Sequence, residues 1–550
     1  MIVKMKHLDL ICVASERNAT LEKLRSLGAV HLDLAQSAGA GVAEAKGAAS
    51  EAEQAVRHIQ KARGKAPKGA ADCTVEQVLD LVKEREALKG EKDRLEREIR
   101  TYAPYGDFDP VLAAKLRATV EGLDTVVALP EKLPEERLSK LQERVAAIGF
   151  ALDDMEKTLA GCDEGCILKE FPGLADRIAF EQAKELLQDH GAVAVISGWI
   201  PVSREADLMA EVQGTKTGSL FERSASIGWG VLLREAAEGE VPPTLIEPPK
   251  FFKSVKALFE GLGIAPGYTE ADVSVPFMCY FSLFFAMLVG DGGYGAIFLA
   301  ATLWAWKKFG TSPWVKLLTV FSVGTILWGL LSNTWFGAGI PWCADWPTVK
   351  WLGGVGAEQG HEYDNMMFLC FTIGVTHLML ARLWNGISMI NSRACLSQFG
   401  WAGMVLFMYL VTNSIVGIFP GIPTWAYWMF GVSFGTVFIQ AKGIDKGMLF
   451  LNAMSVLGDI ISYVRLFAVG LASVKVAENF NMMAVDLGLP IWIKWLPLVL
   501  ILLVGHGLNL AMAGLSILVH AVRLNTLEFS NHKGISWAGY QFKPFHKTEK

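Results

Sequence analysis

Arg465 is the residue of this 550-residue sequence whose position most needs a chemical reason. It lies in the apolar segment LGDIISYVRLFAVGLASVKVA, and Asp459 is the only other charged residue between Gly447 and Phe467. A guanidinium stays protonated near neutral pH, and placing one at mid-membrane costs at least about 2.5–3.5 kcal/mol. Such a residue normally faces a partner or a water-filled cavity. Snorkelling to the membrane surface is the structural alternative, but the long apolar flanks make it difficult, so the sequence favours a function for Arg465.

The helical face that carries Arg465 consists mostly of small residues. Steps of three or four residues place on this face Ser455, Gly458, Ser462, Arg465, Val469 and Ala472. Small side chains let another helix approach closely. A partner that slides past the face would need such a surface, although ordinary tight helix packing would produce it too. We predict that Ser462 and Arg465 take part in ion translocation.

A second polar face follows the last apolar segment. Its members are again three or four residues apart: His506, Asn509, Ala513, Ser516, His520 and Arg523. Hydrogen bonds between helices would explain one or two of them, at about 0.6 kcal/mol each. Five polar residues on one face instead favour a hydrated path for ions. Arg523 by itself could also be a cytoplasmic anchor.

Acidic residues inside or beside the apolar segments are few, and we expect them to have structural or coupling roles. These candidates are Asp291, Asp459 and Glu528. Asp459 precedes Arg465 by six residues and so lies on a different helical face. A direct ion pair between these two is therefore not expected, and each acid is expected to hold helices together.

Eight apolar segments in the second half are long enough to suggest membrane-spanning helices. They cover residues 274–290, 292–307, 314–337, 365–386, 398–418, 423–440, 448–475 and 493–523. The first two are joined by Gly290-Asp291-Gly292-Gly293, which predicts a tight hairpin. The chain is therefore expected to be a multi-pass protein of the lipid bilayer with an all-α membrane domain.

Charges between these segments predict their orientation, because cytoplasmic loops are enriched in Lys and Arg. One set of connections and the C-terminal tail hold Lys307, Lys308, Arg382, Arg393, Lys442, Lys446, Lys533, Lys543, Lys547 and Lys550. The other set holds Asp345, Glu358, Glu362, Asp364, Glu478 and Asp486, with only Lys350 and Lys494 against them. Both termini are expected in the cytoplasm.

The first 250 residues have a different character, with 75 of the chain's 107 Lys, Arg, Asp and Glu residues. We expect a cytoplasmic arm over 1–250, with α/β lobes at about 1–35 and 175–240. Between them, about 44–160 is expected to form a helical stalk, a long antiparallel coiled coil. An eight-helix membrane domain over 251–530 and a cytoplasmic tail over 531–550 complete the predicted organisation.

Several kinds of chemistry are not expected from this sequence. It has no GxxxxGK[ST] loop, and its GDGGYG stretch lies between apolar segments, so no ATP chemistry and no cofactor are predicted. There is no basic patch for nucleic acid. The eight cysteines are dispersed and fit reduced thiols. The close pair Cys162 and Cys166 lacks two further ligands nearby, so no metal site is expected.

Ordered motifs along the whole chain resemble subunit I of bacterial V/A-type ATPases, the counterpart of the eukaryotic V-ATPase a subunit. They are ISGWIP at 196–201, PPKFFKSVKALFEGLG at 248–263, the GDGGYG hairpin, SVLGDIISYVRLFAVGLA at 455–472, GLSILVHAVRLNTLEFSNH at 514–532 and the F-x-P-F ending at 542–545. The last two long motifs contain Arg465 and Arg523.

The resemblance implies a stator subunit of a rotary ATPase in the bacterial inner membrane, not an enzyme by itself. Its implied partners are a proteolipid ring, peripheral stalk subunits, and the central-stalk and catalytic subunits. Arg465 would face the carboxylates of the ring and Arg523 would support it, moving H⁺ or Na⁺ with ATP hydrolysis or synthesis. Ser473 and Ala513 stand where eukaryotic members have a histidine and a glutamate, and the arm is short for the family.

Two other functions fit parts of the sequence. A stand-alone secondary transporter would also carry polar residues in the membrane, but no internal repeat joins the two halves of the membrane segment. A membrane scaffold or sensor would explain the arm and leave Arg465 without a role. Copurification with rotary-ATPase subunits would distinguish the three.

Overall fold

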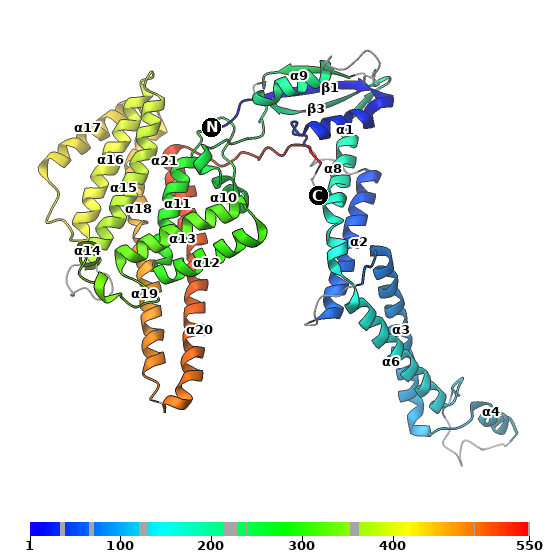
Figure 1. Ribbon diagram of the computed structural model, residues 1–550. Helices are drawn as coiled ribbons and strands as arrows, with labels where there is room; N and C mark the ends of the chain where they lie inside the picture. The colour runs from blue at the N-terminus through cyan, green and yellow to red at the C-terminus, as the bar shows by residue number, and fades with distance from the viewer. Residues whose placement is uncertain are drawn as a thin grey trace. The chain divides into compact units, whose positions relative to one another are not determined.

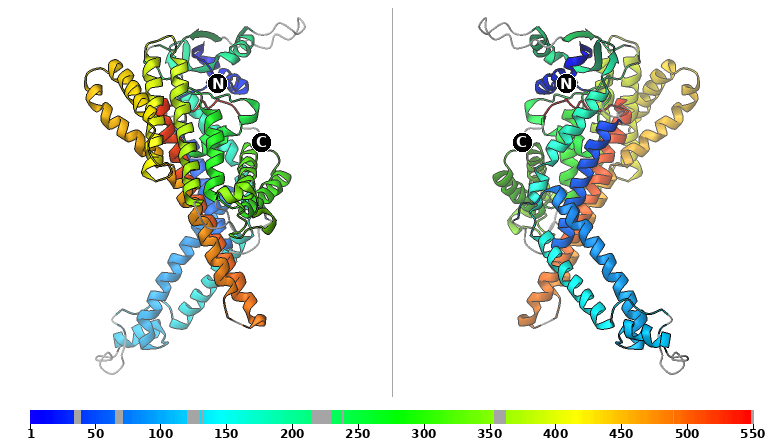
Figure 2. Two further views of the ribbon diagram at one scale, coloured as in Figure 1. Left: turned by 90° about the vertical axis from the view of Figure 1, so that its left-hand side faces the viewer. Right: turned by 90° about the vertical axis from the view of Figure 1, so that its right-hand side faces the viewer.

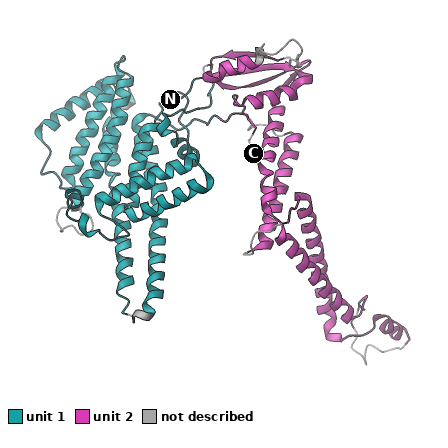
Figure 3. Ribbon diagram, viewed as in Figure 1, with its two compact units in different colours: residues 1–4, 238–542 teal, residues 5–237, 543–550 magenta. Residues whose placement is uncertain are grey.

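The computed structural model describes residues 1–33, 39–64, 71–119, 130, 132–213, 229–237, 239–352, 362–488 and 490–547. The chain is mostly helical and divides into two compact units (Figure 3). Unit 1 comprises Met1–Lys4 and Glu238–Phe542, and unit 2 comprises Met5–Ala237 and Lys543–Lys550. Figure 1 labels most of the helices and two of the strands.

Unit 2 contains one antiparallel sheet in the order β2-β3-β1-β4. Its strands are β1 (Met5–Val13), β2 (Gln188–His190), β3 (Val193–Pro201) and β4 (Trp229–Arg234). Leu8, Leu10 and Cys12 alternate along β1, and all three are buried. The segments expected as two α/β lobes thus contribute to one sheet, because β1 pairs with β3 and β4 from the second of them. Beyond these strands, His31 forms isolated bridges to Trp199 and Pro544.

The helices of unit 2 form its elongated part (Figure 1). They are α1 (Arg17–Leu27), α2 (Ala40–Arg63), α3 (Val75–Tyr102), α4 (Pro110–Thr119), α6 (Leu138–Gly161), α7 (Glu164–Leu168), α8 (Phe171–Glu185) and α9 (Glu205–Gln213). Helix α3 packs along α6, and α2 packs against α8. Thr74 and Gln77 form a reciprocal capping box that fixes the start of α3.

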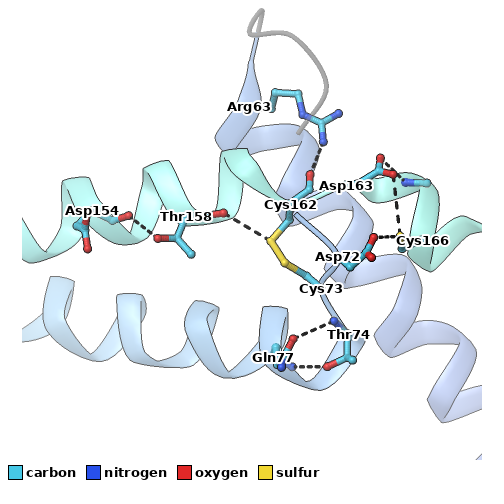
Figure 4. Close-up of a disulfide and its surroundings, with 11 residues drawn as sticks. Arg63, Asp72, Cys73, Thr74, Gln77, Asp154, Thr158, Cys162, Asp163 and Cys166 are labelled. Carbon is cyan, nitrogen blue, oxygen red and sulfur yellow. Dashed lines mark hydrogen bonds between the residues drawn. A yellow bond between two sulfur atoms is a disulfide. The ribbon is translucent and has the colours of Figure 1, made fainter. Parts of the chain in front are cut away.

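A disulfide joins Cys73, just before α3, to Cys162, just after α6 (Figure 4). The expectation of eight reduced thiols is therefore wrong for this pair, whose Cα atoms lie 5.8 Å apart although 89 positions separate them in the sequence. The antiparallel packing of α3 and α6 creates that proximity. Cys166 stays a free thiol, and its Sγ donates to Asp72 Oδ1 at 2.8 Å.

Replacing Cys73 with alanine is expected to loosen this junction. A disulfide that closes a loop of this size stabilises a fold by about 2–4 kcal/mol. Amide hydrogen exchange at residues 71–79 and 155–162 of the full chain should therefore become faster. Cys166→Ala is the matched control, because it removes a neighbouring thiol and no disulfide. Equal exchange rates in the two variants would contradict the prediction.

Unit 1 is built from apolar helices around a large core. Their bounds are α10 (Val255–Leu262), α11 (Ser274–Val289), α12 (Gly292–Phe309), α13 (Pro313–Ser332), α14 (Pro347–Leu352), α15 (Glu362–Ser388), α16 (Ala394–Ile415), α17 (Thr424–Gln440), α18 (Ile444–Ile461), α19 (Val464–Val485), α20 (Ile491–Ser516) and α21 (Ser530–Lys533). Helices α19 and α20 pack side by side and project beyond the other helices of unit 1 (Figures 1 and 2). Large buried side chains such as Phe277, Phe284 and Phe371 fill the core.

Five helices in the described part of the chain are long and apolar enough to cross a membrane. They are Pro313–Ser332, Tyr363–Ser388, Ala394–Ile415, Lys446–Val485 and Ile493–Lys533. The other three predicted spans correspond to α11, α12 and α17, which contain 16, 18 and 17 residues. Helices of this length reach only the lower limit for a membrane crossing. The chain is thus a multi-pass membrane protein, and the number eight stays a prediction.

The C-terminal segment contributes to both units. Within unit 1, Gly539 donates to the Ala265 carbonyl and Phe542 to the Thr244 carbonyl. Within unit 2, Phe545 is 4% exposed and belongs to the core beneath the sheet. The Lys543 N–H donates to His31 Nδ1 at 2.9 Å.

Acidification is expected to weaken the binding of residues 543–547 in unit 2. Burial lowers the pKa of His31, although the nearby Lys543 carbonyl opposes this. When residues 543–547 are detached, His31 is exposed and takes up a proton at a higher pH than in the folded unit. The bound state of these residues therefore loses stability as the pH falls through about 6.5. The protection of the Phe545 amide, which is its exchange rate relative to the intrinsic rate at the same pH, should be weaker at pH 5.5 than at pH 7.5. His31→Asn keeps an acceptor that does not titrate, so protection in this variant should be the same at the two pH values.

Candidate functional site

Arg465 lies in the first turn of α19, directly after a break in the seventh predicted span. Its Nε donates to the Ser462 carbonyl at 2.8 Å, and its Nη2 donates to Glu528 Oε1 at 2.7 Å. The Arg465 side chain is 22% exposed and that of Glu528 only 5%. Arg465 therefore has a buried counter-ion from the last span and keeps a partly open face.

Arg523 shares the same carboxylate, since its Nε lies 3.6 Å from Glu528 Oε1. The chain is π-helical over Ile517–Ala521 and Leu524–Phe529. A π-helix brings residues five apart onto one face, which places Arg523 and Glu528 on the same side. Two cations thus meet one anion. Among the described residues, no hydrogen-bond partner reaches Glu528 Oε2.

The small-residue face around Arg465 is largely uncovered in this chain. Ser455, Gly458 and Ala472 are exposed, and Ser462 and Val469 are half-buried. A Cβ atom added at Gly458 would meet nothing within 4 Å among the described residues. Arg465 therefore stands on a smooth surface on which a further helix could pack.

The predicted polar face of the last span divides into two parts. Its first part joins α12 and α19, because Asn509 donates to the Tyr294 hydroxyl at 3.1 Å and to the Ser473 carbonyl at 2.9 Å. His506 Nδ1 lies 2.7 Å from the same hydroxyl. Ala513 is buried beside Tyr294. Nothing in the sequence around Tyr294 marks it as a site residue, and only its contacts with α20 reveal it.

The second part of that polar face lies where α-helical spacing no longer holds. Ser516 donates to the Met512 carbonyl within its own helix. His520 and Arg523 follow in and after the first π-helical segment, and His520 Nδ1 is buried without a hydrogen-bond partner in the described part of the chain. The π-helical segment Ile517–Ala521 therefore rotates Arg523 away from the face that an ideal α-helix would give it.

Asp291 is the N-cap of α12 and binds four backbone amides. Its Oδ1 accepts from Gly293 at 2.7 Å, Tyr294 at 3.3 Å and Phe336 at 2.8 Å, and its Oδ2 accepts from Gly337 at 2.9 Å. The carboxylate is 1% exposed. It therefore ties the hairpin between α11 and α12 to the loop after α13.

Among the described residues, Asp459 forms no ion pair with Arg465 and instead belongs to a separate polar chain. Its Oδ2 lies 3.1 Å from His532 Nε2, and Arg382 Nε donates to His532 Nδ1 at 3.0 Å. These contacts link α18, α21 and α15. Asp459 thus joins three helices close to the site.

The whole arrangement offers a fixed positive charge at the edge of an uncovered helical face, with polar groups on either side along the last span. Such a charge favours the ionised form of a carboxylate that approaches it.

Curated relatives agree in their names. The chain is 31% identical over 401 residues to V-type ATP synthase subunit I of Borreliella burgdorferi, which covers 68% of this chain and 63% of that protein. It is 26% identical over 648 aligned residues to V-type ATP synthase subunit I 1 of Treponema pallidum, and all of both proteins is covered. The chain belongs to the subunit I family of V/A-type ATP synthases.

Archaeal members of the family are similar too. The chain is 26% identical over 466 residues to A-type ATP synthase subunit I of Methanocaldococcus jannaschii and spans 64% of its length. No protein-family model matches the chain. These relatives are named as subunits of ATP synthases. The resemblance predicted from the sequence motifs is confirmed.

Proposed function

We propose that this chain is the membrane stator subunit of a rotary V/A-type ATPase, in which Arg465 acts on the ion-carrying carboxylates of a proteolipid ring. The observation that carries the proposal is the position of Arg465. Its guanidinium is held by Ser462 and Glu528, yet it is partly exposed on an uncovered face of small residues. That face has the shape a rotating helical ring would need.

The mechanism follows from electrostatics. A ring carboxylate that faces lipid keeps its H⁺ or Na⁺, because an unpaired charge there is costly. When it reaches Arg465, the nearby cation favours the ionised carboxylate and the ion leaves. The positive charges of Arg465 and Arg523 also repel the free ion, which keeps an inlet path separate from an outlet path. Rotation driven by ATP hydrolysis becomes directional transport, and the reverse drives synthesis.

Two polar regions would supply the half-paths. The cluster of His506, Asn509, Ser473 and Tyr294 would line one path. Ser516, His520 and Arg523 would border the other, on the side of the predicted cytoplasmic tail. The eight-span topology, the cytoplasmic termini, the coiled-coil character of the arm and its attachment to peripheral stalks belong to the same proposal.

Purification of the tagged full chain from its native bacterial inner membrane in mild detergent tests the assignment. We expect a proteolipid ring, stalk subunits and ATP-hydrolysing catalytic subunits to copurify with it. A chain that purifies without them and transports ions alone in vesicles would be a secondary transporter. A chain with other partners and no transport would be a scaffold. Either result contradicts the proposal.

A further inference from the structure

The break between α18 and α19 determines which atoms Arg465 can reach. In a continuous α-helix the Ser462 carbonyl would accept the N–H of Leu466. Here the Leu466 N–H donates to the Tyr463 carbonyl at 3.0 Å, and the Ser462 carbonyl accepts Arg465 N at 3.3 Å and Arg465 Nε at 2.8 Å. The tighter turn therefore leaves the Ser462 carbonyl open to the guanidinium.

Tyr463 lies in this break and is fully buried. Its hydroxyl is 2.9 Å from Nδ1 of His377 on α15. Its ring packs so closely on Gly374 that a Cβ atom there would lie 2.7 Å from it. Both the ring and the hydroxyl of Tyr463 are thus fixed by α15.

His377 also touches the segment that supplies the counter-ion. Its ring is stacked between Tyr280 at 4.0 Å and Phe529 at 4.5 Å between ring centroids. Phe529 directly follows Glu528, the residue that binds Arg465 Nη2. His377 therefore contacts both Tyr463, two residues before Arg465, and Phe529, the residue after Glu528.

The hydrogen bond between His377 and Tyr463 is polar although both side chains are buried. His377 is fully buried, and no described residue forms a hydrogen bond with its Nε2. A site that required only volume would be filled at lower cost by apolar side chains, because a buried polar group without a partner is destabilising. The retained hydrogen bond specifies one geometry of the break.

We propose that His377 and Tyr463 are positioning residues, which hold the break and the Glu528 segment in register so that Arg465 points toward the ring. The inference rests on the proposed function of Arg465. Misplacing a reacting group by about 1 Å can reduce a rate by roughly a hundredfold. Loss of the hydrogen bond should therefore reduce transport more than it reduces assembly.

Tyr463→Phe in the complete membrane complex removes only the hydroxyl. We expect ATP-driven ion uptake into vesicles to fall at least about tenfold, while the complex still assembles and loses no more thermal stability than the control variant below. Tyr409→Phe is the matched control, because it removes another hydroxyl from a buried tyrosine. That hydroxyl lies 2.9 Å from Thr372 Oγ1, and Tyr409 is distant from Arg465 in the sequence. Equal transport in the two variants would overturn the inference.

A second pair of variants separates hydrogen bonding from packing and serves even where Tyr463→Phe does not assemble. His377→Asn retains a polar atom near the position of Nδ1, whereas His377→Leu retains volume only. We expect the Asn variant to transport ions at least about tenfold faster than the Leu variant. A Leu variant that equals or exceeds it would show a packing role and overturn the inference.

Failure of this inference can be told apart from failure of the proposed function. Wild-type transport in Tyr463→Phe, combined with loss of transport in Arg465→Ala, overturns only the positioning role. Retained transport in Arg465→Ala overturns both.

Discussion

Arg465→Ala should abolish ATP-driven ion transport while the complex still assembles. The substitution removes the cation that would discharge the ring carboxylate, and loss of one charge-stabilising donor in a low-dielectric site costs about 100-fold or more. Assembly is expected to survive because Arg523 remains beside Glu528 Oε1 and compensates its charge. Ion uptake into vesicles that contain the purified complex measures the effect.

The control for this prediction is Arg393→Ala. Arg393 is an exposed arginine at the start of α16, so its loss should leave transport unchanged. The yield of complex from both variants must be compared before transport rates are. A fully assembled Arg465→Ala complex that still pumped at the wild-type rate would exclude the proposed role.

Asp291→Asn is expected to prevent stable assembly. The amide that replaces the carboxylate has one acceptor oxygen, so at least the Gly337 N–H or the three N–H groups at Oδ1 lose their acceptor. Each buried donor without a partner costs about 1–3 kcal/mol, and the new NH₂ group faces donors. We expect a loss of at least about 3 kcal/mol, measured as a lower melting temperature and a lower yield of folded chain.

Asp345→Asn provides the comparison for Asp291→Asn. Its side chain is 91% exposed and lies 3.1 Å from Lys350 Nζ. A surface ion pair contributes at most about 1 kcal/mol, so the variant should fold normally. If Asp291→Asn melted at the same temperature as Asp345→Asn, the four amide contacts would not be important for stability.

Much of this protein could be predicted from local sequence. The cost of a charge in an apolar segment depends on its immediate neighbours, which is why Arg465 could be selected without coordinates. Helices appear at all eight predicted ranges, because apolar length is also a local property. The family likeness came from ordered motifs and is confirmed by curated relatives.

Other features depend on segments that are distant in the chain. Arg523 and Glu528 share one face because Leu524–Phe529 is π-helical, whereas α-helical spacing would separate them. Glu528 meets Arg465 because two segments about 60 residues apart in the chain pack together. Cys73 and Cys162 meet because two long helices run antiparallel. Strand β1 pairs with β3 and β4, which both come after the helical stalk in the chain.

Local sequence was therefore enough to locate a cation within an apolar segment and to identify the family. Tertiary structure decided where that cation points, through the Ser462 carbonyl, the Glu528 carboxylate and the His377–Tyr463 pair. The cost of placing a charge in an apolar segment depends on its neighbours along the chain, so the sequence is enough to recognise it. Direction and hydrogen-bond partners arise from helices that pack together only in the folded protein.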